Sequence, residues 1–398
     1  MRRFYDDEGM NFAVLLGLGF VYHGIADAGE SLATIERVPE GDRDAWVREW
    51  KATADRLRDD AEAGEKGGHR VSAREKLLRA STYYDHASSA SPGTTYDDQF
   101  TPLWERHRDC WDRAAALFDP PVEPIEIPYE GAALAGYFFR PDTTGARRPT
   151  FILNNGSDGP VISQWSLGGH AAVERGWNAI TFDGPGQGAA LHRQKLYFRH
   201  DWEKVVTPVV DYLLTRPDVD PDKIVLQGVS QAGYWAPRAA AFEHRLAALV
   251  ADPGVIDVAS SWTQHFPKEL VQLLDDGNKK DFDALMDGAD ATQEAILAWR
   301  RAPYGTSSTY DALMAARRMH LDAATIEQIE CPTLIADPDH EQFWPGQSQQ
   351  LYDALTCPKQ LVRFTTEEGA DWHCEPGAQA LRDERVFDWL EETLQIGG

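Results

Sequence analysis

A chain of 398 residues is longer than most single hydrophobic cores, which favours one large domain with an attached cap, or two domains. Hydrophobic residues make up 42% and charged residues 26%, a composition that argues against disorder. The net charge of −25 repels a phosphate backbone and argues against nucleic acid as a partner. The four cysteines form no C-x-x-C pair, so we expect neither a disulfide framework nor a structural metal site.

The apolar run 12–22 superficially imitates a signal peptide, because basic residues precede it and small residues follow it. However, Asp6, Asp7 and Glu8 place acid where such a peptide needs positive charge, and the run contains two glycines. We therefore expect a buried N-terminal helix and a cytoplasmic protein. No apolar stretch approaches the ~20 residues that span a bilayer, so no membrane partner is expected.

The first 121 residues are predicted to form a helical N-terminal cap domain. Apolar residues recur at helical spacing in 42–60. Ser72 and Glu75 fit a capping box and predict a second helix that starts there, and Thr101 with Pro102 opens a third. Prolines at 120 and 121 end this helical region.

Residues 122–398 are predicted to form an α/β domain with a mostly parallel sheet. A pair of strands joined at Glu130-Gly131 comes first, and short apolar runs then alternate with helical segments. The runs are 151–153, 179–182, 224–226, 246–250, 333–336 and 361–364. The stretch 255–329 has helical composition without a convincing strand, so we interpret it as a helical insertion that joins the lid.

A serine follows the 224–226 run within Gly228-Val229-Ser230-Gln231-Ala232. A sharp turn from strand to helix needs small residues two before and two after a nucleophile, and Gly228 and Ala232 meet that demand. A lone match of this kind occurs by chance in many chains, but here a strand precedes it and a helical run follows. Ser230 is therefore the candidate nucleophile.

Acyl chemistry at a serine also needs N–H donors for the developing oxyanion. The backbone amide of Gln231, directly after the nucleophile, is one candidate. The second should follow an early core strand, where the Gly-rich turn 154–159 lies, and we favour the amide of Ser157. Such a turn is also compatible with a purely structural role.

The general base is sought among the histidines that follow the late strands. His373 lies between the last predicted strand and the terminal helix, and His340 is its rival. The orienting acid belongs after the 333–336 run, where Asp337, Asp339 and Glu341 crowd one loop. We choose Glu341, four residues before a proline, with Asp339 as the alternative; at least two of the three are then solvated loop acids.

The loop Asp183-Gly184-Pro185-Gly186-Gln187-Gly188 looks at first like a phosphate cradle. It lacks both the G-x-G-x-x-G spacing and a P-loop lysine. We interpret it as a tight strand-end loop that shapes the pocket. Asp339 beside His340 suggests metal ligation in the same superficial way, but no further ligand cluster supports it.

These residues together resemble the FrsA-like α/β-hydrolases, which include 2,6-dihydroxypseudooxynicotine hydrolase and the fungal polyketide-shortening hydrolases of the Ayg1 type. The similarity covers nearly the whole chain. It is carried by Ser72-Ala73-Arg74-Glu75 through Tyr84, Ile127-Pro128-Tyr129-Glu130-Gly131, the 182–188 and 236–243 strings, and Glu368-Gly369-Ala370 ahead of His373.

The resemblance implies an α/β-hydrolase fold with a helical N-terminal cap, a Ser-acid-His triad with the acid at Glu341, and often cleavage of a carbon–carbon bond next to a ketone. The chain departs from relatives in three places. Relatives commonly carry Gly at the position of Ala232, an aromatic at that of Ser157, and Asp at that of Glu341. These departures border the reacting groups and leave the reaction outcome open.

We expect a serine hydrolase that cleaves a carbon–carbon bond or an ester or lactone of an aromatic or polyketide-like small molecule, without a cofactor. An acyltransferase or cyclase that uses the same acyl-serine is the alternative, and a ligand-binding protein without turnover is a third. The oligomeric state is open, with a homodimer as one option. The candidate substrate contacts are Tyr83, Tyr84, His86, Asp158 and Trp235.

Overall fold

The computed structural model describes residues 3–286 and 291–396. Within them, eight strands form one sheet in the order β1-β2-β4-β3-β5-β6-β7-β8. The strands are β1 Glu123–Tyr129, β2 Ala132–Phe139, β3 Arg148–Asn154, β4 Asn178–Phe182, β5 Val219–Val229, β6 Ala248–Asp252, β7 Thr333–Pro338 and β8 Lys359–Phe364. In this order, each neighbouring pair from β4 to β8 is parallel. Strand β2 pairs antiparallel with both of its neighbours, β1 and β4. The predicted mostly parallel sheet is confirmed.

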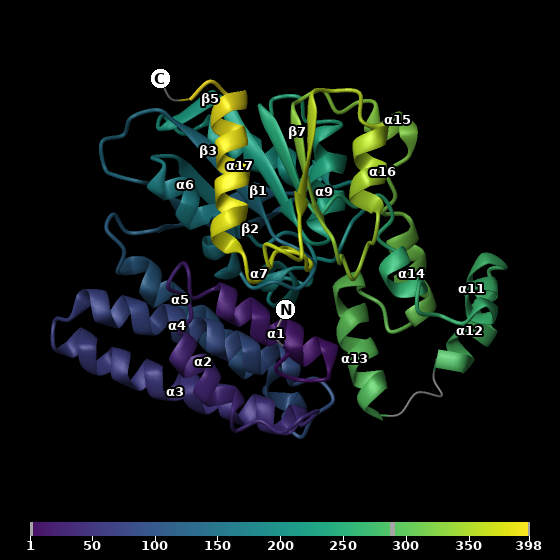
Figure 1. Cartoon of the computed structure of the whole chain (residues 1–398), viewed down its shortest axis with the longest axis horizontal. Coiled ribbons are helices and arrows are strands. Elements are labelled where there is room, and N and C mark those ends of the chain that lie inside the picture. The colour runs from purple at the N-terminus through teal and green to yellow at the C-terminus, as the bar shows by residue number, and fades with distance from the viewer. Residues whose placement is uncertain (1–2, 287–290, 397–398) are drawn as a thin grey trace.

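Helices cover both faces of the sheet (Figure 1). Neighbouring residues of β3 illustrate why, since Phe151 and Leu153 pack into one hydrophobic cluster and Ile152 into the other. The first cluster includes residues of α6 and α17, and the second includes residues of α8, α9 and α16. These helices are α6 His170–Glu174, α7 Gly188–His192, α8 Glu203–Leu214, α9 Ala232–Ala240, α16 Gln347–Ala354 and α17 Gln379–Thr393.

The N-terminal part is helical up to β1 and forms a layer below the sheet in the view of Figure 1. Its helices are α1 Glu8–Gly19, α2 Ala28–Ile35, α3 Arg43–Lys66, α4 Arg70–Ala90 and α5 Phe100–Ala116. The expected N-terminal helix is α1, and the side chain of Asp7 caps it by accepting from the amide of Met10 at 2.7 Å. No helix of the described residues is both long and apolar enough to cross a membrane.

The predicted capping box at Ser72 is wrong. Helix α4 begins at Arg70, so Ser72 already lies in its first turn, and His69 at the N-cap makes no side-chain cap bond. Arg70 instead donates to the carbonyls of Ala116, Leu117 and Phe118 at the end of α5. A tertiary contact that satisfies the end of a neighbouring helix has overridden the local motif.

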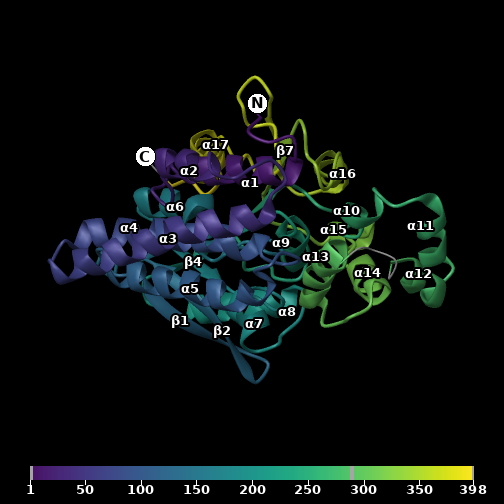
Figure 2. The same ribbon diagram turned by 90° about the horizontal axis from the view of Figure 1, so that it is seen from below.

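The stretch 255–329 contains helices rather than further strands of the sheet. They are α10 Ser260–Thr263, α11 Lys268–Asp275, α12 Lys279–Met286, α13 Ala291–Arg301, α14 Thr309–Arg317 and α15 Ala323–Ile326. Helices α11 to α14 lie to one side of the sheet, and α13 is the one nearest the N-terminal helices (Figure 1 and Figure 2). Residues 287–290 of this stretch lie outside the described part of the chain.

A buried ion pair fastens the N-terminal helices to the sheet. Arg108 of α5 is 4% exposed and donates to Asp183, just after β4, at 2.6 Å and to the hydroxyl of Tyr137 on β2 at 2.7 Å. The paired charges hold the pKa of Arg108 above its usual range although burial alone would lower it. Loss of one partner would leave the other charge buried and uncompensated.

We predict that Arg108→Met lowers the free energy of unfolding by about 3 to 5 kcal/mol, measured by urea denaturation. Arg193→Met is the matched control, because Arg193 joins α5 through Glu105 in an exposed pair at 2.5 Å. That substitution should cost only about 0 to 1 kcal/mol. Equal effects of the two substitutions would contradict a special role for the buried pair.

Candidate active site

Ser230 lies at a sharp turn between β5 and α9. Its backbone has φ 59°, in the left-handed region that non-glycine residues rarely adopt. A Cβ at Gly228 would come within 2.1 Å of the carbonyl oxygen of Ala232, and one at Gly233 within 1.8 Å of that of Pro253. The amide of Ser230 donates to the carbonyl of Asp252 at 2.7 Å. Close packing around two glycines therefore forces the strained turn.

The side chains of Ser230, His373 and Glu341 form one hydrogen-bonded chain. His373 Nε2 lies 2.9 Å from Ser230 Oγ, and His373 Nδ1 lies 2.8 Å and 3.0 Å from the two carboxylate oxygens of Glu341. His373 is 4% exposed and Glu341 is 9% exposed. A carboxylate requires a proton on Nδ1, so Nε2 is left to accept the serine proton.

The environment of Glu341 keeps its carboxyl ionised. Burial would raise the pKa of this carboxyl, but the charge and hydrogen bond of His373 and two backbone amides together hold the pKa below its usual value. Those amides belong to Phe343 and Trp344 and lie 2.8 Å and 3.1 Å from one carboxylate oxygen. Glu341 is thus fixed in position and charge beside the imidazole.

The rival residues have other partners. Asp339 accepts from Arg363 at 2.7 Å and from the amide of Thr366 at 3.2 Å, and Asp337 lies 3.3 Å from Arg363. His340 bonds to Asp371 at 2.8 Å, with a side chain that is 64% exposed. The structure therefore brings Glu341 to the imidazole of His373, and it assigns Asp339 to a surface ion pair.

The loop after β3 packs directly against the nucleophile. A Cβ at Gly156 would lie 2.8 Å from Ser230 Cβ and 3.2 Å from Ser230 Oγ. The side-chain amide of Gln187 donates to the carbonyls of Asn155 and Gly156 at 2.8 Å and 2.5 Å. The 183–188 loop, predicted to shape the pocket, thus braces this segment and lines the cavity through Asp183, Gly186 and Gly188.

The two candidate oxyanion donors lie in the same cavity as Ser230. The amide of Gly156 is occupied by the side chain of Asn155 at 2.9 Å, so Ser157 supplies the next amide along the loop. Within the described residues, the backbone amides of Ser157 and Gln231 have no hydrogen-bond acceptor. Both are available to a substrate oxygen.

A cavity of about 960 Å³ opens above Ser230 and His373. Its walls come from α1, α4 and α5, from the 255–329 stretch, and from the loops at the carboxyl ends of the strands. The aromatic side chains that line it include Phe12, Trp104, Trp262, Phe343 and Trp344. This volume accommodates a drug-sized ligand.

Four of the five expected substrate contacts are wrong, because only Asp158 lines the cavity. The hydroxyl of Tyr83 bonds to the amide of Asp27 at 2.9 Å, that of Tyr84 bonds to Asp55, and the ring of His86 packs against Trp50. Trp235 stacks on Trp202 with ring centroids 4.1 Å apart. All four side chains are buried in the protein core.

Sequence reasoning missed several walls of the cavity. The ring centroid of Phe12 in α1 lies 6.4 Å from those of His373 and Trp372. The sequence of 12–22 predicts a buried helix but no contact with the reacting histidine. Trp262 and Trp299 belong to the 255–329 stretch. No local signal marks these residues, since their roles depend on contacts between distant parts of the chain.

A second Ser-His-Asp chain lies in the interior. His23 bonds to Ser166 Oγ at 3.0 Å and to Asp383 at 2.9 Å. Ser166 is fully buried and does not line the cavity. This chain ties the turn after α1 to α17, and its serine is inaccessible to a substrate.

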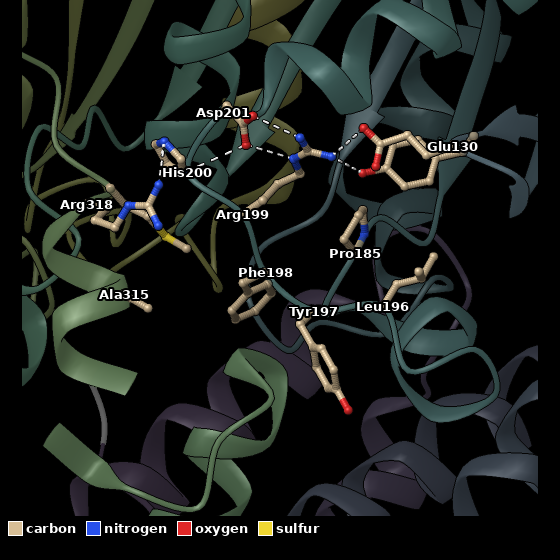
Figure 3. A pocket seen from close by; sticks show the side chains of 12 residues that line it. Glu130, Pro185, Leu196, Tyr197, Phe198, Arg199, His200, Asp201, Ala315 and Arg318 are labelled. Carbon is tan, nitrogen blue, oxygen red and sulfur yellow. Dashed lines mark hydrogen bonds and ion pairs between the residues drawn. The ribbon is translucent and has the colours of Figure 1, made fainter. Parts of the chain in front are cut away.

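A smaller cavity of about 360 Å³ lies beside the first, and Tyr197 and Phe198 line both. Its polar groups largely bind one another (Figure 3): Arg199 pairs with Asp201 and Glu130, and Arg318 contacts His200. It contains no serine beside a histidine among the residues that line it. Within the described residues, no group of three or more His, Cys, Asp or Glu side chains is placed to hold a metal ion.

No family model matches the chain, but curated fungal proteins align with its whole length. Hydrolase acrC of Aspergillus aculeatus is 30% identical and hydrolase LUC6 of a Fusarium species is 29% identical, each over 100% of this chain and 99% of the relative. The 20-hydroxy-prefusarin hydrolase FUS2 of Gibberella moniliformis is 27% identical over the same shares.

Solved structures share the fold at lower identity. The 2,6-dihydroxy-pseudo-oxynicotine hydrolase superposes with a TM-score of 0.75 at 21% identity, over 94% of this chain and 95% of that one. AbyA5 superposes with a TM-score of 0.65 at 17% identity, over 98% and 99%. With its fungal relatives, the chain belongs to the FrsA-like family of α/β-hydrolases and is a hydrolase.

Proposed function

We propose that this hydrolase uses Ser230 to break a carbon–carbon bond next to a ketone in an aromatic or polyketide-like substrate. The observation that carries the proposal is the hydrogen-bonded chain from Ser230 through His373 to Glu341 at the floor of an aromatic cavity. One relative is a 20-hydroxy-prefusarin hydrolase, which supports the choice of substrate. The carbon–carbon cleavage common in the family supports the choice of bond.

In the proposed reaction, His373 Nε2 takes the proton of Ser230 while Oγ attacks a substrate carbonyl. The carbonyl oxygen becomes negative between the amides of Gln231 and Ser157. The carbon–carbon bond then breaks, its electron pair leaves as an enolate, and the imidazolium returns the proton to the enolate carbon. Water next attacks the acyl-serine with His373 as base, which gives a carboxylic acid and restores the free serine.

We also propose that the helical part, residues 1–121, acts as a cap on a catalytic domain 122–398, with 255–329 completing the lid. Residues of α1, α4, α5 and α13 line the cavity together with Ser230, which supports this division. The ring of Phe12 lies beside that of His373, which supports the N-terminal run as part of the cap. We propose a cytoplasmic location for the enzyme. We propose a small-molecule substrate as the binding partner and a homodimer as one option for the oligomeric state.

We predict that Ser230→Ala abolishes covalent labelling by a fluorophosphonate and lowers turnover of ester and β-diketone probes by at least about 1,000-fold. The native enzyme should gain one adduct by mass spectrometry, and Ser166→Ala should leave it in place. The products of the β-diketone benzoylacetone identify the bond, since cleavage gives an acid and a methyl ketone. An adduct that persists in Ser230→Ala would contradict the proposed nucleophile.

Glu341→Gln should lower kcat by about 1,000- to 10,000-fold, because it removes the charge that fixes the imidazole tautomer. Asp339→Asn is the control from the same loop and should change kcat by less than about 3-fold, since Asp339 pairs with Arg363. Steady-state kinetics on an ester probe measure both. A larger loss in Asp339→Asn would reassign the acid.

Gly156→Ala should lower the rate of fluorophosphonate labelling by about 100-fold or more, because the added methyl group would collide with Ser230 and displace the oxyanion loop. Gly64→Ala in α3 is the control, since its Cβ would meet its nearest neighbour at 3.6 Å. Thermal unfolding of both variants shows whether the fold is retained. A folded Gly156→Ala enzyme with native labelling would refute the proposed role of this loop.

A further inference from the structure

Asp85 of α4 is an ionisable side chain that lines the active-site cavity. Its backbone carbonyl accepts from the hydroxyls of Ser88 and Ser89, but within the described residues its carboxyl group takes part in no hydrogen bond or ion pair. Asp183 of the same cavity, by contrast, is bound to Arg108. Asp85 is therefore free to bind a ligand.

Asp85 is connected to the reaction centre through the loop after β3. Gly156 packs against Ser230, and Asp158, two residues further along, lines the same cavity as Asp85. Asp158 is close enough for its charge to act on the carboxyl of Asp85. Ser230, Ser157, Asp158 and Asp85 thus line one cavity, so a substrate bound at Ser230 shares that cavity with Asp85.

Burial and the charge of Asp158 raise the pKa of Asp85 to about 8. The other groups that face this space do not offset that effect. Burial lowers the pKa of His107 on α5 and of His192 on α7 to about 4, so both are neutral at pH 7. Arg108 is held by Asp183, and burial raises the pKa of the Tyr304 hydroxyl, which stays neutral.

Two more cations line this cavity. Lys195 donates to the carbonyl of His192 at 3.2 Å, and Arg300 of α13 lies over the ring of Trp262 at 4.2 Å. The charge of Arg300 interacts with Asp158 rather than with Asp85. Asp85 is therefore mostly protonated at pH 7. It presents an O–H donor to the cavity, as other buried carboxylic acids do in enzymes that stabilise enolates.

We propose that Asp85 donates a hydrogen bond to a second carbonyl oxygen of the substrate, so that the cavity selects a β-dicarbonyl group lying between Ser230 and α4. This inference rests on the proposed carbon–carbon cleavage. When the bond breaks, the electron pair becomes an enolate whose charge sits on that second oxygen, and the Asp85 hydrogen bond stabilises it. Asp85 keeps its proton, because His373 supplies the proton that goes to carbon.

An ester substrate has no second carbonyl at this place, so the role of Asp85 separates the two reactions. Asp85→Leu, which removes the donor, should lower kcat for benzoylacetone by about 10- to 100-fold and change hydrolysis of a nitrophenyl ester far less. Asp85→Asn retains an N–H donor and should recover most of the lost activity. Asp59→Asn on the exposed face of α3 is the matched control and should change neither reaction.

The pH profile gives a readout that a structural role would not produce. Benzoylacetone cleavage by the native enzyme should fall as the pH rises through about 8, because Asp85 then loses its proton. The fall should be absent in Asp85→Asn. In Asp158→Asn it should move to lower pH, because the charge that raises the pKa of Asp85 is gone.

Inhibition separates failure of this inference from failure of the proposed function. Benzoylacetone should compete with the ester probe, and its inhibition constant should rise about 10-fold in Asp85→Leu. An unchanged inhibition constant, or equal losses of ester and diketone turnover in Asp85→Leu, would overturn the role of Asp85. A native enzyme that labels at Ser230 and binds benzoylacetone through Asp85 but does not cleave it would contradict the carbon–carbon reaction alone.

Discussion

The left-handed backbone at Ser230 is the constraint on which the rest of the site depends. It is tolerated because Gly228 and Gly233 allow the turn to pack against neighbouring carbonyls, and because the Ser230 amide is bound by the carbonyl of Asp252. The turn exposes one hydroxyl at the carboxyl edge of a parallel sheet. The loops after β7 and β8 end at the same edge, so Glu341 and His373 meet the serine there.

A buried charge network supports the turn from within the fold. Arg382 of α17 donates to Asp252 at 2.7 Å and to the carbonyl of Leu167 at 3.1 Å. Burial and the charge of Asp252 raise the pKa of Glu375 well above its usual value, which favours its neutral form beside this pair. The network therefore fixes Asp252, whose carbonyl accepts from the amide of Ser230. Glu375, a member of the network, lies two residues after His373 in the sequence. Stability of the interior and geometry of the reacting groups are coupled here.

The sheet and the reacting triad could be predicted because their signals are local. Short apolar runs mark the strands, and the nucleophile turn requires small residues at fixed offsets from Ser230. The sequence offers three acids in the loop after β7. In the structure Asp337 and Asp339 pair with Arg363, and Glu341 is the one beside His373. The false capping box at Ser72 arose because Arg70 binds the end of α5, a contact that no local pattern records.

The cavity walls could not be predicted in the same way. Tyr83 and Tyr84 are aromatic and lie on α4, yet they face the interior of the helical layer. Asp85, the next residue, lines the cavity, because adjacent residues of a helix point in different directions. Which face of α4 lines the cavity depends on the packing of α4 against α3 and α5. Substrate contacts therefore required the tertiary structure.

The most direct test of the central claim is NMR of the imidazole protons, because it observes the His373–Glu341 hydrogen bond itself. A far-downfield proton on Nδ1 of His373 is expected in the native enzyme. It should vanish in His373→Ala and persist in His23→Ala, which removes the buried look-alike chain. A downfield signal that survives in His373→Ala and disappears in His23→Ala would contradict the account.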